Sequence, residues 1–97
     1  MKRILIVEDD SSIAELLTDY LETSGFIVEL CTNGLEALKC INGNDYNLII
    51  LDIMLPAMSG FDILKEVRHK QFIPIIILSA RKEEIDKIIV PFLQTFS

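Results

Sequence analysis

The chain has 97 residues, of which 51% are hydrophobic and 25% charged, a size and balance that fit one globular domain. This composition excludes a disordered, collagen-like or disulfide-dense protein. Fifteen acidic residues against nine basic ones give a formal charge of −6, which argues against nucleic-acid binding by this domain alone and against binding to anionic membranes.

The chain shows neither a targeting segment nor a metal-type cysteine pattern. No apolar run approaches the length of a signal-peptide core or of a membrane span, so we expect a cytoplasmic protein with no membrane partner. Cys31 and Cys40 have no metal-ligand spacing around them. We therefore expect both to be reduced thiols.

The first half of the chain predicts two strand–helix units. Residues 4–7 are apolar throughout and predict a buried strand, and residues 12–24 follow with apolar side chains at helical spacing. We expect Ser12 to begin this helix in a capping box with the glutamate three residues on. Residues 26–31 alternate apolar and mixed positions, which predicts a strand nearer the sheet edge. A short helix capped by its first residue is predicted over 33–41.

The second half continues the same alternation. Residues 48–51 predict a second apolar strand, and a proline-containing loop separates it from a helix over 61–69. Residues 75–78 predict a third apolar strand, and a further helix begins within 82–89. Strands that are apolar on both faces and separated by helices indicate a doubly wound parallel α/β sheet covered on both sides.

Acidic residues stand where two of the apolar strands end. Glu8, Asp9 and Asp10 follow the first strand, and Asp52 follows the second. All strands of a parallel sheet end at the same edge, where ligands bind in open α/β folds. An acidic triplet by itself is also typical of a solvated turn before a helix. Acids at both strand ends, however, would repel one another unless a cation such as Mg²⁺ lay between them.

The same edge suggests phosphoryl chemistry. A carboxylate beside a metal, as expected for Asp52, can accept a phosphoryl group as an aspartyl phosphate. Ser79 follows the third apolar strand, and its hydroxyl could donate to a phosphoryl oxygen.

Three segments together resemble a known family. I-L-I-V-E-D-D, L-I-I-L-D-I-M-L-P-A-M-S-G and I-P-I-I-I-L-S-A are similar to the receiver domain of bacterial two-component response regulators. The sequences of these segments most resemble those of receivers that precede a winged-helix DNA-binding domain in transcription regulators. The resemblance extends from residue 2 to about 87 of a single receiver domain over 1–97. It implies a flavodoxin-like fold, phosphorylated by a partner histidine kinase.

The resemblance assigns roles to five residues. Asp52 matches the phosphoacceptor, and Glu8 with Asp9 matches the acidic pair. With Asp52 and the backbone carbonyl of Met54, this pair would hold Mg²⁺. Ser79 matches the switch hydroxyl.

The surrounding residues are assigned less directly. Pro56 and Gly60 match the loop that shapes the site. Asp10 lies one residue past the acidic pair, and the resemblance assigns it no role in the site.

The last ten residues depart from the family pattern. Receivers normally continue into a fifth strand, a lysine followed by proline, and a last helix. Residues 88–97 contain Pro91-Phe92, but Val90 stands where the lysine would be. We therefore expect the regular fifth strand and last helix to be lacking. The strand over 75–78 would then be an exposed edge, covered by the apolar tail or by a second copy in a homodimer or swapped dimer.

Four functions can be set against this sequence. The leading one is a phosphorelay signalling switch that is not an enzyme in the turnover sense. The alternative is a signalling-impaired truncated receiver that binds metal and self-associates through its exposed sheet edge. An aspartate-nucleophile phosphatase would need a second aspartate two residues after Asp52, where Met54 stands, and a flavin protein would need a phosphate-binding loop after the first strand.

Overall fold

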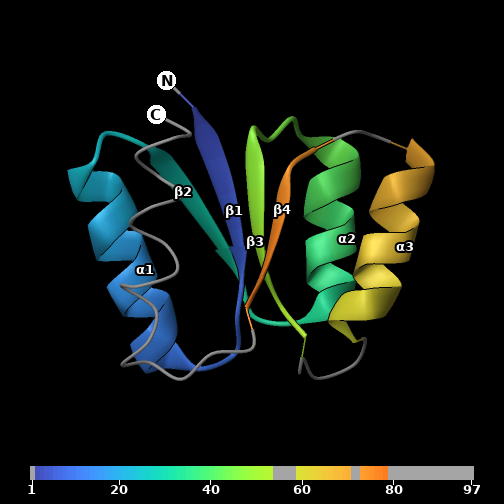
Figure 1. Cartoon of the computed structure of the whole chain (residues 1–97), viewed down its shortest axis with the longest axis horizontal. Helices are drawn as coiled ribbons and strands as arrows, with labels where there is room; N and C mark the ends of the chain where they lie inside the picture. Colours follow the sequence, from blue (N-terminus) through green and yellow to red (C-terminus); the bar gives the residue numbers. More distant parts are fainter. Residues whose placement is uncertain (1, 54–58, 71–72, 79–97) are drawn as a thin grey trace.

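The computed structural model is a parallel β-sheet with helices on both faces (Figure 1). It describes residues 2–53, 59–70 and 73–78. The elements in chain order are β1 (Arg3–Val7), α1 (Ser11–Thr23), β2 (Ile27–Cys31), α2 (Gly34–Gly43), β3 (Leu48–Asp52), α3 (Gly60–Lys70) and β4 (Ile75–Leu78). Among these described residues no helix is both long and apolar enough to cross a bilayer.

The sheet order places the two acid-bearing strands side by side. Its four strands lie in the order β2-β1-β3-β4, and every neighbouring pair is parallel. All four strands therefore end at one edge of the sheet, the lower edge in Figure 1. This arrangement confirms the predicted doubly wound parallel α/β fold. The helix expected within 82–89 and the tail over 88–97 lie outside the described residues.

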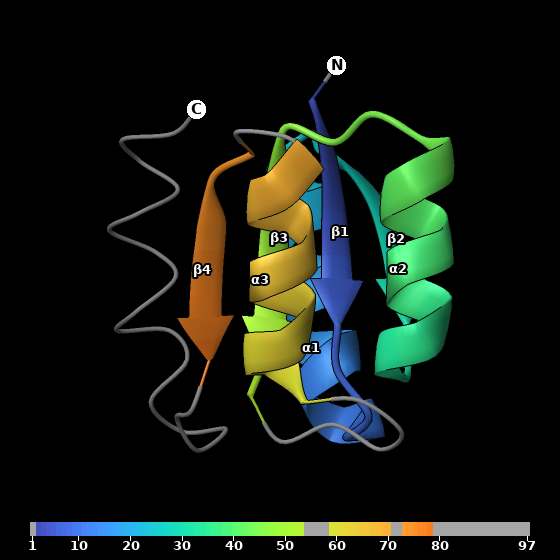
Figure 2. The ribbon, with the colours of Figure 1, turned by 90° about the vertical axis from the view of Figure 1, so that its right-hand side faces the viewer.

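Two apolar layers hold the sheet between its helices. Helix α1 covers one face, and α2 and α3 cover the other, as Figure 2 shows from the α2 and α3 side. Residues alternate between the two layers along β1, because successive side chains of a strand point to opposite faces. Ile4 and Ile6 pack with Leu17 and Leu21 of α1, whereas Leu5 packs in the layer that includes α2 and α3 residues.

The central strands are the most deeply buried part of the molecule. All apolar residues of β1 from Ile4 onwards and of β3 before Asp52 have no exposed surface. Strand β2 lies at an edge, as its alternating pattern predicts, and Leu30 there is 46% exposed. The inner pair β1 and β3 therefore forms a rigid support for whatever follows each strand.

The start of α1 differs from the prediction. Asp10 caps this helix, and its Oδ1 accepts from the backbone N–H groups of Ser12 and Ile13 at 2.9 and 3.2 Å. The expected capping box at Ser12 is wrong, because a carboxylate two residues earlier already satisfies those amides. The cap predicted at Asn33 is confirmed, since its side chain accepts from the N–H of Glu36 at 3.0 Å.

Candidate functional site

The acids at the ends of β1 and β3 meet because the two strands are in register. Val7 pairs with Leu51, so Glu8 and Asp52 are the next residue on each strand. Successive side chains of a strand point to opposite faces of the sheet, and this alternation directs the side chains of Glu8 and Asp52 to the face that α1 covers. The backbone N–H of Glu8 also donates to the carbonyl of Cys31 in β2 at 3.0 Å, which ties the residue after β1 to the neighbouring strand.

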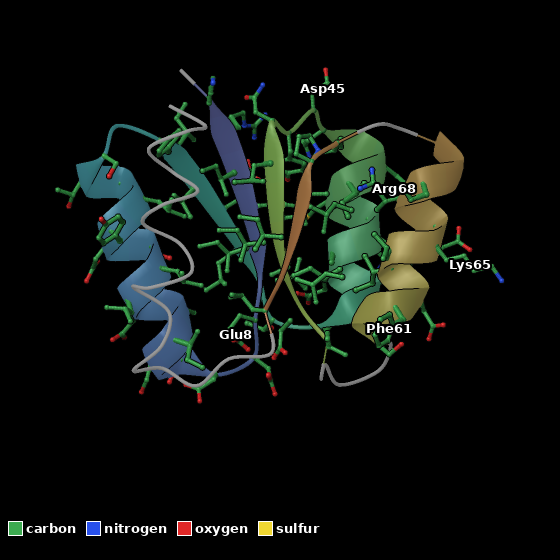
Figure 3. All side chains as sticks on the ribbon, viewed as in Figure 1. Glu8, Asp45, Phe61, Lys65 and Arg68 are labelled. Carbon is green, nitrogen blue, oxygen red and sulfur yellow. The ribbon has the colours of Figure 1, made fainter. Side chains whose placement is uncertain are left out.

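Three carboxylates form one cluster at this edge. One oxygen from each of Glu8, Asp9 and Asp52 lies within 4.8 Å of the others. Glu8 is only 4% exposed, Asp52 is half-buried and Asp9 is exposed, so the cluster opens towards solvent on one side. Figure 3 shows Glu8 at the edge where the strands end, whereas Asp45 lies at the opposite edge of the sheet.

Burial raises the pKa of the Glu8 carboxyl to about 8, because desolvation disfavours its charged form. A side-chain hydrogen bond with Asp52 raises this pKa further, since only a protonated carboxyl can donate. Hydrogen bonds from the backbone amides of Asp10 and Asp9 act in the opposite direction. Without a cation, Glu8 is thus largely protonated near neutral pH, and the cluster holds less negative charge than three ionised acids.

In metal-free buffer, the free energy of unfolding should fall as pH rises from about 4.5 to about 8. The folded chain keeps a proton on Glu8 across this range and the unfolded chain releases it, so raising the pH favours unfolding. A difference of one unit between the pKa in the folded and in the unfolded chain corresponds to about 1.4 kcal/mol. We therefore expect the free energy of unfolding to fall by a few kcal/mol. Urea unfolding with EDTA at pH 5 and pH 8 measures it. Glu8→Gln is the control, and equal pH dependence in both proteins would contradict the assignment.

Two neighbouring residues support the cluster. The backbone N–H of Asp10 donates to the Glu8 carboxylate at 3.3 Å, a role the sequence pattern does not indicate. At the start of α3, a Cβ on Gly60 would lie 2.5 Å from the carbonyl oxygen of Asp52 and 2.8 Å from the Cα of Ile53. Only glycine therefore allows α3 to begin this close to the end of β3.

The cluster offers only oxygen donors. Mg²⁺ is a hard cation that prefers oxygen ligands, and it usually binds through one or two carboxylates while keeping several waters. A half-buried carboxylate beside such a cation, as Asp52 would be, also has the character of a nucleophile for phosphorus. Met54, Pro56 and Ser79, which the resemblance adds to the site, lie outside the described residues.

Comparison with known proteins agrees with this geometry. Residues 4–91 match the family model for the response regulator receiver domain. The chain belongs to the response regulator receiver domain family. It is therefore a signalling domain.

Two curated relatives of this receiver domain are transcriptional regulators. The chain is 44% identical over 89 residues to a homolog of the transcriptional regulatory protein CpxR from Haemophilus influenzae, a match covering 92% of this chain and 39% of that protein. It is 42% identical over 89 residues to the alkaline phosphatase synthesis transcriptional regulatory protein PhoP of Bacillus subtilis, covering 91% and 37%. The receiver domain thus spans about two fifths of the length of these relatives.

Solved structures show the same fold. One similar chain comes from the crystal structure of histidine kinase ThkA in complex with response regulator protein TrrA, with a TM-score of 0.77, 43% identity, and coverage of 82% of this chain and 70% of that one. Another is TrrA from Thermotoga maritima in complex with Mg²⁺ and BeF, with a TM-score of 0.75, 30% identity, and coverage of 94% and 98%.

Proposed function

We propose that this receiver domain accepts a phosphoryl group on Asp52 from a sensor histidine kinase, with Mg²⁺ held by Glu8, Asp9 and Asp52, and acts as a signalling switch. The observation that carries this proposal is the cluster of three carboxylates within 4.8 Å at the end of the two central strands. Two similar solved structures support it: a response regulator in complex with a histidine kinase, and a response regulator bound to Mg²⁺ and BeF.

The reaction is one phosphoryl transfer for each chain. A carboxylate oxygen of Asp52 forms a bond to phosphorus while the bond from phosphorus to the donor nitrogen or oxygen breaks, and the leaving group keeps that electron pair. Half-burial of Asp52 leaves one side open to the donor. The domain itself keeps the phosphoryl group, so it is a stoichiometric acceptor and not an enzyme with turnover.

The role of the other acids is to bind the cation. Glu8 and Asp9 would hold Mg²⁺ next to Asp52, with Glu8 fixed by burial and by the amide of Asp10. The cation supplies positive charge that neutralises the phosphoryl oxygens during transfer. By resemblance, the carbonyl of Met54 would add a ligand and the hydroxyl of Ser79 would bind the phosphoryl group.

We also propose that the domain regulates transcription as part of a longer protein. The curated relatives are transcriptional regulators more than twice as long as this match. A winged-helix output domain in the same polypeptide would supply DNA binding, because the charge of −6 makes the receiver itself a poor nucleic-acid ligand.

Pairing of two copies through β4 stays a prediction. Within the described residues β4 is an edge strand, and Ile77 there is 38% exposed. An apolar edge of this kind is a template for another strand. The family match and the receiver–kinase neighbour favour the signalling switch over a signalling-impaired remnant.

Incubation with acetyl phosphate and Mg²⁺ should add one phosphoryl group to each chain. With EDTA in place of Mg²⁺, incorporation should fall by at least about tenfold, because the carboxylates would repel the incoming phosphate. Intact-protein mass spectrometry measures both states. Absence of the adduct with Mg²⁺, or equal incorporation with EDTA, would refute the proposal.

A further inference from the structure

The two cysteines of the chain lie in contact although nine positions separate them. The Sγ atoms of Cys31 and Cys40 are 3.1 Å apart, and both thiols are free. Cys31 is the last residue of β2, and Cys40 lies on α2, which packs against the sheet. The packing of α2 on β2 therefore brings the two sulfur atoms together, and their separation along the sequence does not by itself predict this contact.

The two thiols differ in access. Cys31 is 5% exposed and belongs to the apolar layer beneath α2, whereas Cys40 is half-buried and packs at the border of that layer. A reagent in solution thus reaches Cys40 first, and Cys31 is already in place behind it. A partly exposed attacking thiol with a second thiol in contact is the arrangement of a dithiol that oxidises within one chain.

We propose that Cys31 and Cys40 form a reversible intramolecular disulfide with a low-molecular-weight disulfide as the oxidant. A shift of about 1 Å would bring the Sγ atoms to bonding distance. The disulfide would join the end of β2 to α2, next to the Cys31 carbonyl that accepts the N–H of Glu8. The proposal concerns a modification site apart from Asp52 and does not depend on phosphorylation.

The exchange proceeds in two balanced steps. The Cys40 thiolate attacks one sulfur of the oxidant, the oxidant's S–S bond breaks, and its other half leaves as a thiolate and takes up a proton. Cys31 then loses its proton and attacks the Cys40 sulfur of the mixed disulfide. The second half of the oxidant leaves as a thiol, so two protein thiols are oxidised and one disulfide is reduced to two thiols.

Excess oxidised glutathione at micromolar chain concentration is the direct test. The intact protein should lose the mass of two hydrogen atoms, and dithiothreitol should restore the original mass. Trypsin cleaves after Lys39, between the two cysteines, so a non-reduced digest should contain the two cysteine peptides joined to each other. A stable glutathione adduct on Cys40, or disulfide-linked dimers as the main product, would overturn the proposal.

Cys40→Ser is the matched variant, because the substitution is at a partly exposed position and should leave the fold intact. In this protein Cys31 should stay unmodified by oxidised glutathione. For wild type, oxidation should raise the thermal unfolding midpoint by roughly 10 °C, since the disulfide closes a short loop in the unfolded chain. A midpoint that falls on oxidation would show that the link strains the fold, contrary to the proposal.

Discussion

Asp52→Asn should abolish phosphoryl incorporation from acetyl phosphate while the chain stays folded. The substitution keeps the shape of the side chain but removes the carboxylate oxygen that attacks phosphorus. No other acid of the cluster replaces it in the proposed role, because Glu8 is buried and Asp9 lies two residues past the end of β1. We expect a loss of at least about a hundredfold in adduct formed, measured by intact-protein mass spectrometry.

Asp45→Asn is the matched control for this experiment. It makes the same chemical change at an exposed position at the opposite edge of the sheet (Figure 3). This variant should incorporate phosphate as wild type does. Undiminished incorporation in Asp52→Asn, or an adduct that maps to Asp9 in wild type, would contradict the assignment of Asp52 as acceptor.

Gly60→Ala should destabilise the fold and slow phosphorylation together. The new Cβ would lie 2.5 Å from the carbonyl oxygen of Asp52 and 2.8 Å from the Cα of Ile53. Both are backbone atoms, which cannot move aside by a change of rotamer. Either the start of α3 or the end of β3 must shift. We expect a loss of about 1–3 kcal/mol in the free energy of unfolding, from overpacking. Displacement of Asp52 should slow phosphorylation by roughly 10- to 100-fold.

Gly43→Ala provides the same substitution without the clash. Beyond its chain neighbours and the backbone of its own helix, no atom lies within 4 Å of a Cβ at Gly43, which ends α2. Alanine there should be neutral or slightly stabilising, because it restricts the unfolded chain. Chemical unfolding followed by circular dichroism measures both variants. Equal stability of Gly60→Ala and Gly43→Ala would show that the close approach at β3 is not needed.

The acid cluster could be predicted because it depends on strand order and strand ends alone. Apolar runs locate β1 and β3, and parallel pairing of neighbours then places Glu8 and Asp52 at one edge. The bounds of β4 also agree with the apolar run over 75–78, although this edge strand is only partly buried. Burial on both faces leaves β1 and β3 few alternatives to a strand, so the lengths of these two strands are readable from the sequence.

Features that depend on side-chain and backbone distances could not be predicted. Three acids in a row do not show that the Asp10 side chain caps α1 and that the Asp10 amide donates to Glu8. The clash at Gly60 arises from how closely α3 approaches β3, which no local pattern records. The contact between Cys31 and Cys40 likewise requires the packing of α2 on the sheet.

Calorimetric titration with Mg²⁺ tests the central claim most directly. Wild type and Asp45→Asn should bind one Mg²⁺ with equal affinity. Glu8→Gln and Asp52→Asn should each bind at least about tenfold more weakly, because each removes one of the clustered carboxylates. If either of these variants bound Mg²⁺ as tightly as wild type, the two strand ends would not share one cation, and the proposed site would be wrong.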